Sequence, residues 1–307
     1  MATTTATRSA KTRSDASSAG RVRAKSPYPN WFYLPAAVIY GVLFIVPTLI
    51  AFYFSLTRWS IFDSKFIGFD NYVTFFKEPA LVSSLWHTLV YAVITSGLKV
   101  VLGLLLAMLL TSQIIARGYL RSVVFFPVLV STIGVGLTFT VLMNPERGLI
   151  NQSLATIGVQ GPGWLTDPSL ALISVALVDV WKGVGLATLI YIAGIVSIPQ
   201  EYFEAARVDG ASAWDSFRTI VLPLARPATV TVIILSLIGG LRSFDLIWAM
   251  TRGGPGFTSD VIASVIYKQY QAGFYGLSTA GNVVLFLLVT AIIFPLSRYL
   301  NSKEVDL

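Results

Sequence analysis

Four ionisable side chains lie within two otherwise apolar stretches of the chain, residues 170–199 and 228–251. They form two pairs, Asp179 with Lys182 and Arg242 with Asp245. An ionisable group in a hydrocarbon environment costs at least about 2 to 3 kcal/mol, so such groups pair with one another or face a polar pathway. The spacing within each pair places both charges on one helix face, where they can neutralise each other. The alternative is that these faces line a polar cavity that binds a solute.

The residue types that catalysis most often uses are scarce. The chain has no Cys and a single His, His87. Disulfides, thiolate metal sites and Cys nucleophiles are therefore excluded. No segment fits G-x-x-x-x-G-K-[ST], the loop that holds the phosphates of a nucleotide. We expect a chain that is not an enzyme and holds no cofactor or metal, with His87 hydrogen-bonded near the end of an apolar segment.

A charged segment, residues 200–223, separates the two apolar stretches. Residues 200–209 are good helix formers, and Gly210 supplies a turn. Ser212 is expected to cap a second short helix, with Asp215 at the position where a capping box places an acid. The two predicted helices have an apolar side that needs to be covered. Its members are Tyr202, Phe203, Ala206, Val208, Trp214 and Phe217.

Membrane-spanning helices must position these residues. Hydrophobic residues make up 55% of the chain and charged residues 12%, and the mean hydropathy is +0.73, far above that of soluble domains. A span needs about 20 apolar residues, and the strict alternation of barrel strands is missing. The predicted fold class is all-α, a polytopic membrane protein with six transmembrane helices. The predicted spans are residues 31–57, 85–115, 122–144, 170–199, 228–251 and 277–295.

Lys and Arg residues are distributed unequally between the two sides of these spans. One side carries Arg8, Lys11, Arg13, Arg21, Arg23, Lys25, Arg117, Arg121, Arg207, Arg218, Arg226, Arg298 and Lys303. The other side carries Arg58, Lys65, Lys77, Arg147, Arg252 and Lys268. The side richer in Lys and Arg is cytoplasmic, so both termini and residues 200–223 are predicted to be cytoplasmic. A basic tail beside anionic lipid explains the net charge of +7 without nucleic acid.

The chain is predicted to have two parts. Residues 1–29 form a basic cytoplasmic tail, rich in Ala, Thr, Ser and Arg, which we expect to be disordered. A transit peptide has the same composition and remains the alternative. Residues 30–307 form the membrane domain.

The predicted outer connections are residues 58–84, 145–169 and 252–278. In the first, FIGFDNYVTFFKEP suits a short amphipathic helix at the membrane interface. Turns are expected at residues 161–163 and in RGGPGFTSD, which is followed by the aromatic segment YKQYQAGFYG. These surfaces suit an external partner, and interfacial anchoring or loop packing explains them equally well.

Residues 204–223 match the motif E-A-A-x3-G-x9-I-x-L-P at every defined position. The matching residues are Glu204, Ala205, Ala206, Gly210, Ile220, Leu222 and Pro223. In this the chain resembles the permeases of binding-protein-dependent ABC importers, where the motif is called the EAA loop. The segments NPERGLIN, FDLIW, MTRGGPG and IYKQYQAGFYG are similar to the carbohydrate-uptake branch of that family, the MalF-like and UgpA-like permeases. The resemblance covers most of the chain after Pro29.

The resemblance implies an inner-membrane subunit of a bacterial or archaeal importer for a sugar, an oligosaccharide or glycoside. Its EAA loop would act as a coupling helix that docks on a separate ATPase dimer, which binds ATP and Mg. The residues implied in this contact are Glu204, Ala205, Ala206, Asp209, Gly210, Trp214 and Phe217. The other implied partners are a second, different permease subunit and an extracytoplasmic solute-binding protein.

The resemblance also implies that the spans before and after the loop meet the sugar. The residues implied are Asp179, Gly183, Gly240, Arg242, Ser243 and Asp245. One alternative is an ABC importer permease for a non-sugar solute, against which MTRGGPG and FDLIW argue. Another is an ion-coupled secondary transporter with Asp179 and Asp245 as ion sites, which would not need the loop.

Overall fold

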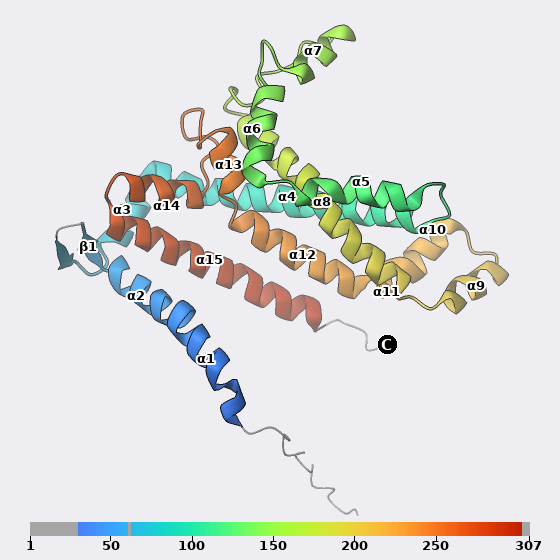
Figure 1. Ribbon diagram of the computed structural model, residues 1–307, viewed down its shortest axis with the longest axis horizontal. Coiled ribbons are helices and arrows are strands. Elements are labelled where there is room, and N and C mark those ends of the chain that lie inside the picture. The colour runs from blue at the N-terminus through green and yellow to red at the C-terminus, as the bar shows by residue number, and fades with distance from the viewer. Residues whose placement is uncertain (1–29, 61–62, 303–307) are drawn as a thin grey trace, which may run out of the picture. The chain divides into compact units, whose positions relative to one another are not determined.

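The computed structural model describes residues 30–60 and 63–302 (Figure 1). The predicted tail, residues 1–29, lies outside the described residues. The helices from the N-terminal side are η1 (Asn30–Tyr33), α1 (Leu34–Tyr40), η2 (Gly41–Ile45), α2 (Val46–Ser55), α3 (Asp70–Lys77), α4 (Pro79–Thr111), α5 (Arg117–Leu129), α6 (Thr132–Leu142) and α7 (Leu149–Thr156). They continue as α8 (Ala171–Val196), α9 (Gln200–Val208), α10 (Ala213–Ser216), η3 (Phe217–Val221), α11 (Leu222–Leu224), α12 (Arg226–Leu241), α13 (Asp245–Met250), α14 (Ile262–Gln271) and α15 (Tyr275–Asn301). Contacts divide the chain into residues 1–47 and residues 48–307.

The helices include four uninterrupted segments long and apolar enough to cross a membrane. They are Trp31–Ser55, Pro79–Thr111, Ala171–Val196 and Tyr275–Asn301. Two further candidates are bent pairs, Arg117–Leu129 with Thr132–Leu142 at 97° and Ala213–Leu224 with Arg226–Leu241 at 66°. The all-α membrane fold is therefore confirmed, with up to six spans if each bent pair counts as one.

The predicted span 122–144 is present as a bent pair of helices with a break between them. Helix α5 contains Pro127, which has no amide hydrogen for the helix ladder, and it ends two residues later. The chain resumes as α6 after Ser131, whose side chain accepts a hydrogen bond from the Gly134 amide at the helix N-terminus. The absence of charge correctly indicated an apolar segment but did not reveal this break.

The predicted span 228–251 is also interrupted. Helix α12 ends at Leu241, and the chain is not helical again until α13 begins at Asp245. Gly239 and Gly240 stand at the end of α12, where their low helix propensity favours termination. Arg242 and Asp245 therefore lie on either side of a break and not on one helix face.

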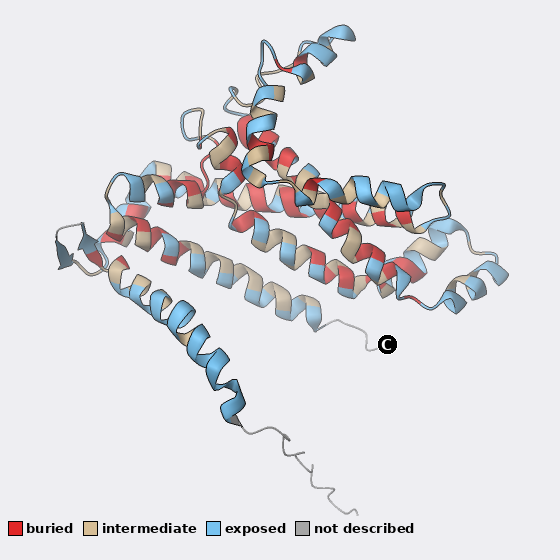
Figure 2. Cartoon of the chain, in the orientation of Figure 1, coloured by how far each residue is buried: buried red, intermediate tan, exposed pale blue. Residues whose placement is uncertain are grey.

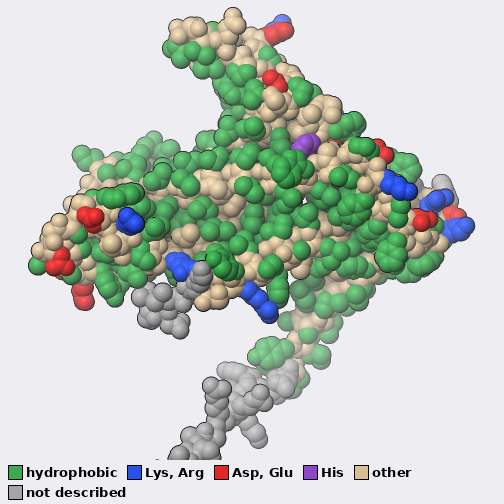
Figure 3. All heavy atoms as spheres, turned by 180° about the vertical axis from the view of Figure 1, so that it is seen from behind, with side chains coloured by type: hydrophobic (Ala, Val, Ile, Leu, Met, Phe, Trp, Pro, Cys, Tyr) green, Lys and Arg blue, Asp and Glu red, His purple; other side chains and the backbone are tan. Residues whose placement is uncertain are grey.

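The core lies where α4, α8 and α12 pack together, and Figure 2 shows buried residues along these helices. Small residues allow the close approach. A Cβ atom added at Gly103 of α4 would lie 2.9 Å from the Cβ of Ala187 on α8. Membrane helices commonly approach through such small residues, because lipid supplies no hydrophobic drive for their association. On the face shown in Figure 3, hydrophobic side chains cover most of the surface.

The first of the predicted outer connections contains the predicted amphipathic helix, α3, and a hairpin that the sequence did not predict. Strands β1 (Thr57–Trp59) and β2 (Ser64–Phe66) pair antiparallel, with Thr57 opposite Phe66. Three residues are too few for a period-two pattern to be distinctive.

Candidate functional site

The segment 200–223 folds as helix, turn and helix. Glu204, Ala205 and Ala206 lie on α9, Asp209 is its C-terminal cap, and Gly210 follows with a φ of +74°. This left-handed conformation is open to Gly without the strain that a Cβ atom would introduce. The Ala211 amide donates to the carbonyl of Ala206 at 2.9 Å, which closes the end of the helix.

The predicted capping box at the start of α10 is confirmed. The Asp215 amide donates to the Ser212 hydroxyl at 3.2 Å, and the Ser212 amide donates to the Asp215 carboxylate at 3.0 Å. Hydrogen bonds from the Ser212 side chain and backbone hold the pKa of Asp215 below its usual value, because they favour the ionised carboxylate. The turn between α9 and α10 is thus fixed at both ends.

The two aromatic residues of the second helix differ in exposure. Trp214 is 66% exposed, whereas Phe217 is partly buried and packs against the core cluster that contains Tyr191 and Ala225. Their ring centroids are 5.3 Å apart. Trp214 therefore presents an exposed apolar surface, and Phe217 connects that surface to the helix bundle.

A cavity of about 490 Å³ lies between this segment and the ends of α4 and α8. Thr111 and Ile195 line it from the long helices, and Phe203, Arg207 and Phe217 line it from the segment itself. Part of the inner face of residues 200–223 is therefore separated from the helix bundle by this cavity.

Within the bundle, Asp179 of α8 pairs with Lys99 of α4. The Lys99 ammonium lies 2.9 Å from the Asp179 carboxylate, and Lys99 is 8% exposed. The predicted pair of Asp179 with Lys182 is therefore wrong, because Asp179 faces α4. Lys99 therefore lies inside the bundle. Gly183 makes room for it, since a Cβ atom there would lie 2.7 Å from the Lys99 Cε.

A buried tyrosine completes this polar group. Tyr91 of α4 is fully buried, and its hydroxyl has no hydrogen-bond partner among the described residues. Asp179 and Ser243 are polar neighbours of this hydroxyl. The structure thus brings Asp179, Gly183 and Ser243 to one side of α4, around a hydroxyl with unused hydrogen-bonding capacity.

The other predicted cavity residues lie differently. Gly240 packs against α4, where a Cβ atom would lie 2.7 Å from the Ala92 Cα. Arg242 and Asp245 are exposed. In residues 30–60 and 63–302 the ion pairs are Lys99–Asp179 and Lys268–Asp260, so the predicted pairing of Arg242 with Asp245 is wrong.

The structure also shows contacts between residues that the sequence did not predict to meet. Phe244, Trp248 and Tyr267 form an aromatic cluster with ring centroids 4.8 to 5.7 Å apart. Asp260, which is fully buried, accepts from Lys268 at 2.6 Å. The carbonyl of Asp260 lies 3.0 Å from Nδ1 of His87, which confirms a hydrogen-bonded His87 near the start of α4. The spacing of these residues in the sequence does not predict their contacts, because the fold brings them together from separate helices and loops.

Comparison with known proteins identifies the family. Residues 99–304 match the family model described as the inner membrane component of binding-protein-dependent transport systems. The chain belongs to this family. It is thus a multi-pass inner-membrane component of a transport system, and the matched region contains every residue predicted for coupling and for the cavity.

Curated relatives match this inner membrane component over most of their length. This chain is 34% identical over 258 residues to the trehalose/maltose transport system permease protein MalF of Thermococcus litoralis, and the match covers 83% of this chain and 88% of the relative. It is 30% identical over 275 residues to the arabinooligosaccharides transport system permease protein AraP of Bacillus subtilis, covering 88% of each chain.

A solved structure shares the fold. A chain of a bacterial ABC transporter involved in the import of the acidic polysaccharide alginate superposes with a TM-score of 0.77 at 22% identity. The match covers 89% of this inner membrane component and 95% of that chain.

Proposed function

We propose that the chain is the permease subunit of an ATP-driven importer that moves a sugar, an oligosaccharide or glycoside, into the cytoplasm. Relatives of 34% and 30% identity bear the names of trehalose/maltose and arabinooligosaccharide permeases. The observation that carries the proposal is the helix, turn and helix at residues 200–223, which matches the EAA motif and exposes Trp214.

Coupling to ATP hydrolysis takes place at this segment. A separate ATPase dimer binds ATP and Mg, and its surface cleft covers Trp214 together with Ala205 and Ala206. Glu204 pairs with a basic residue of the ATPase at the rim of the contact. Closure of the ATPase dimer moves the segment, and Phe217 passes the motion to the core of the bundle.

This arrangement requires residues 200–223 and both chain termini to be cytoplasmic. Figure 1 shows α9 at one end of the bundle of residues 48–307, and α3 and β1 at the other end. The hairpin and α3 then face the outside, where an extracytoplasmic solute-binding protein delivers the sugar. A second, different permease subunit completes the pathway.

The sugar passes the polar residues Tyr91, Asp179 and Ser243, which lie where α4 meets α8 and the break between α12 and α13. The Asp179 carboxylate accepts hydrogen bonds from sugar hydroxyls, the Ser243 hydroxyl donates and accepts them, and the Tyr91 hydroxyl supplies a further partner. Gly183 and Gly240 keep the helices close enough for this, and Arg242 and Asp245 flank the break. Lys99 orients the Asp179 carboxylate through its ion pair. Broken helices are a common location of transporter binding sites, because their free backbone groups bind substrate.

The test is purification of the chain from its native membrane in mild detergent, with the co-purifying proteins identified by mass spectrometry. We expect an ATPase, a second permease with an EAA motif and an exported binding protein. Glu204→Lys should remove the ATPase from this set, while Glu146→Gln on the outer connection should not. Uptake into liposomes by the chain alone, driven by an ion gradient, would contradict the proposal.

A further inference from the structure

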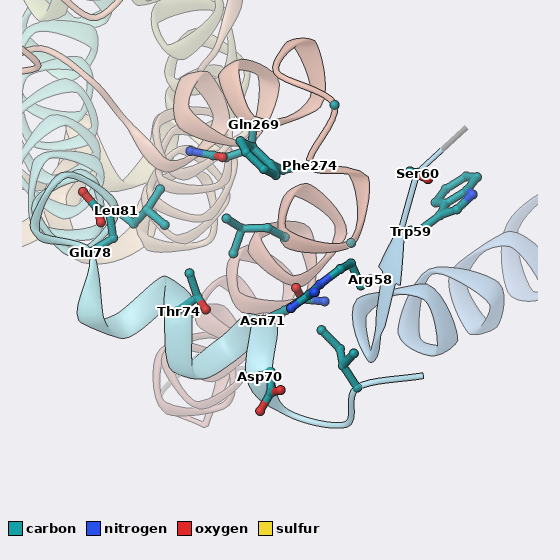
Figure 4. Close-up of a pocket in the computed structure, with 14 residues that line it drawn as sticks. Arg58, Trp59, Ser60, Asp70, Asn71, Thr74, Glu78, Leu81, Gln269 and Phe274 are labelled. Carbon is teal, nitrogen blue, oxygen red and sulfur yellow. The ribbon is translucent and has the colours of Figure 1, made fainter. Parts of the chain in front are cut away.

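A second cavity is lined by residues of α3 and β1, which lie at the opposite end of the bundle from α9 (Figure 1). Figure 4 shows the side chains that line it. Its volume is about 660 Å³, within the usual range of small-molecule sites. The elements around it are β1, α3, the end of α14 and the start of α15. Two sequence segments that the proposed function does not use, FIGFDNYVTFFKEP and YKQYQAGFYG, meet here.

Hydrogen bonds and a close backbone contact fix the frame of this cavity. The side-chain amide of Asn71 on α3 donates to the carbonyls of Ser55 and Thr57, each at 2.8 Å. Gly276 of α15 lies against the Thr57 carbonyl so closely that a Cβ atom would overlap it. Because α3, β1 and α15 are tied together, the cavity keeps its shape without a ligand.

Five polar side chains around the cavity have free hydrogen-bonding groups. Within the described part of the chain, no hydrogen bond or ion pair involves the side chains of Arg58, Asp70, Thr74, Glu78 and Gln269. Arginine donates, the carboxylates accept, and the hydroxyl and the amide do both. A ligand that both donates and accepts at several positions therefore fits this lining.

Aromatic side chains add apolar surface to the same cavity. Phe274 is 60% exposed, and Trp59 is 37% exposed and stacked on Phe54 with ring centroids 4.3 Å apart. Figure 4 shows Phe274 and Gln269 on one side of the cavity and Thr74 on the other. Flat aromatic faces beside hydroxyl partners match the alternation of apolar and polar groups on a sugar ring.

We propose that this cavity binds a ring of a neutral oligosaccharide at the outer surface, apart from the transport pathway. The three charged side chains, Arg58, Asp70 and Glu78, sum to one negative charge, which disfavours an anionic ligand. An apolar peptide side chain would leave the free polar groups without partners, at a cost. The outward orientation and the sugar class rest on the proposed function.

The site gives the importer a means of holding one end of a long substrate. Residues 58–81, which contribute most of the polar side chains, precede the family match at residues 99–304. This part of the cavity therefore lies outside the region that the family model matches.

The test measures binding to the purified full-length chain in lipid nanodiscs by isothermal titration calorimetry. The probes are maltotriose, cellotriose and arabinotriose, with trigalacturonate as the anionic control. We expect saturable binding of at least one neutral trisaccharide and not of trigalacturonate.

Thr74→Trp, which fills the cavity, should abolish binding. Glu78→Gln should weaken it about tenfold, the effect of one charge-assisted hydrogen bond. Glu146→Gln on the outer connection should leave it unchanged.

Two results would overturn the proposal. One is the lack of saturable binding of all three neutral probes. The other is binding that Asp179→Asn removes and that Thr74→Trp and Glu78→Gln leave unchanged, since the sugar then occupies the transport pathway. If Thr74→Trp fails to fold, Asp70→Asn combined with Glu78→Gln replaces it. Because binding is measured without transport, failure of sugar uptake with intact binding would contradict only the proposed function.

Discussion

Lys99 on α4 and Asp179 on α8 form an ion pair of 2.9 Å across the helix interface at the centre of the fold. Removing one partner leaves an uncompensated charge in a largely buried place, at a cost of about 3 to 5 kcal/mol. We predict that Lys99→Met lowers the thermal unfolding midpoint of the detergent-solubilised chain. Lys99→Met with Asp179→Leu should recover most of the loss. An unchanged midpoint in the single variant would show that the pair contributes nothing.

The space for this ion pair depends on Gly183. A Cβ atom there would lie 2.7 Å from Cε and 2.9 Å from Nζ of Lys99. We predict that Gly183→Val displaces Lys99 and lowers both the unfolding midpoint and uptake. Gly97→Val on α4 is the matched control, because nothing outside the helix's own backbone lies within 4 Å of a Cβ atom built there. Equal effects of the two substitutions would contradict the packing argument.

Gly210 controls the turn in the EAA loop. An L-residue in its left-handed conformation costs roughly 1 to 2 kcal/mol, so Gly210→Ala should shift the orientation of α10. We predict that ATP-driven uptake falls severalfold in Gly210→Ala and is lost in Gly210→Pro, with membrane insertion intact. Gly118→Ala, at an open position with an ordinary φ, should retain uptake. Full uptake by Gly210→Pro would refute the coupling role.

The capping box predicts a defined acid response. The folded-state pKa of Asp215 is lowered, so its contribution to stability is fully present above the ordinary carboxyl pKa of about 3.9. It is lost as the pH falls through the lowered value. A carbon-13 NMR titration of aspartate-labelled protein, with the resonance assigned by Asp215→Asn, should show a midpoint below the ordinary value. Ser212→Ala should raise that midpoint, and a midpoint unaffected by Ser212→Ala would exclude the capping hydrogen bonds as its cause.

The orientation of the chain is tested by a reporter fused after Leu307. The distribution of Lys and Arg predicts that a fluorescent protein at this end lies in the cytoplasm and fluoresces, and that alkaline phosphatase there is inactive. A reporter inserted between Gly158 and Val159 in the outer connection should give the opposite pattern. Active phosphatase after Leu307 would overturn the proposed direction of the EAA loop.

Local signals were sufficient for part of this structure. The helix, the turn at Gly210 and the Ser212–Asp215 capping box follow from neighbouring residues, so the sequence predicted them. The partner of Asp179 did not follow, because Lys99 is distant in the sequence and only the packing of α4 on α8 brings them together. The break between Arg242 and Asp245 was missed because the whole apolar segment is long enough to span a membrane, and the low helix propensity of Gly239 and Gly240 was not taken as the end of a helix. The free hydroxyl of Tyr91 is likewise visible only once its neighbours are known.

Helix α12 is bounded by an interruption at each end. It is 16 residues long and meets the preceding helical segment at a 66° bend, and its other end leads directly into the break that contains Ser243. At 1.5 Å per residue, α12 is a rigid helix about 24 Å long with a helix break at each end. In the proposed mechanism, a displacement of the EAA loop therefore moves α12 as a rigid body, and no helix has to bend for the motion to reach the polar residues around Tyr91. The length of α12 in this mechanism therefore sets the distance between the EAA loop and the polar residues Tyr91, Asp179 and Ser243.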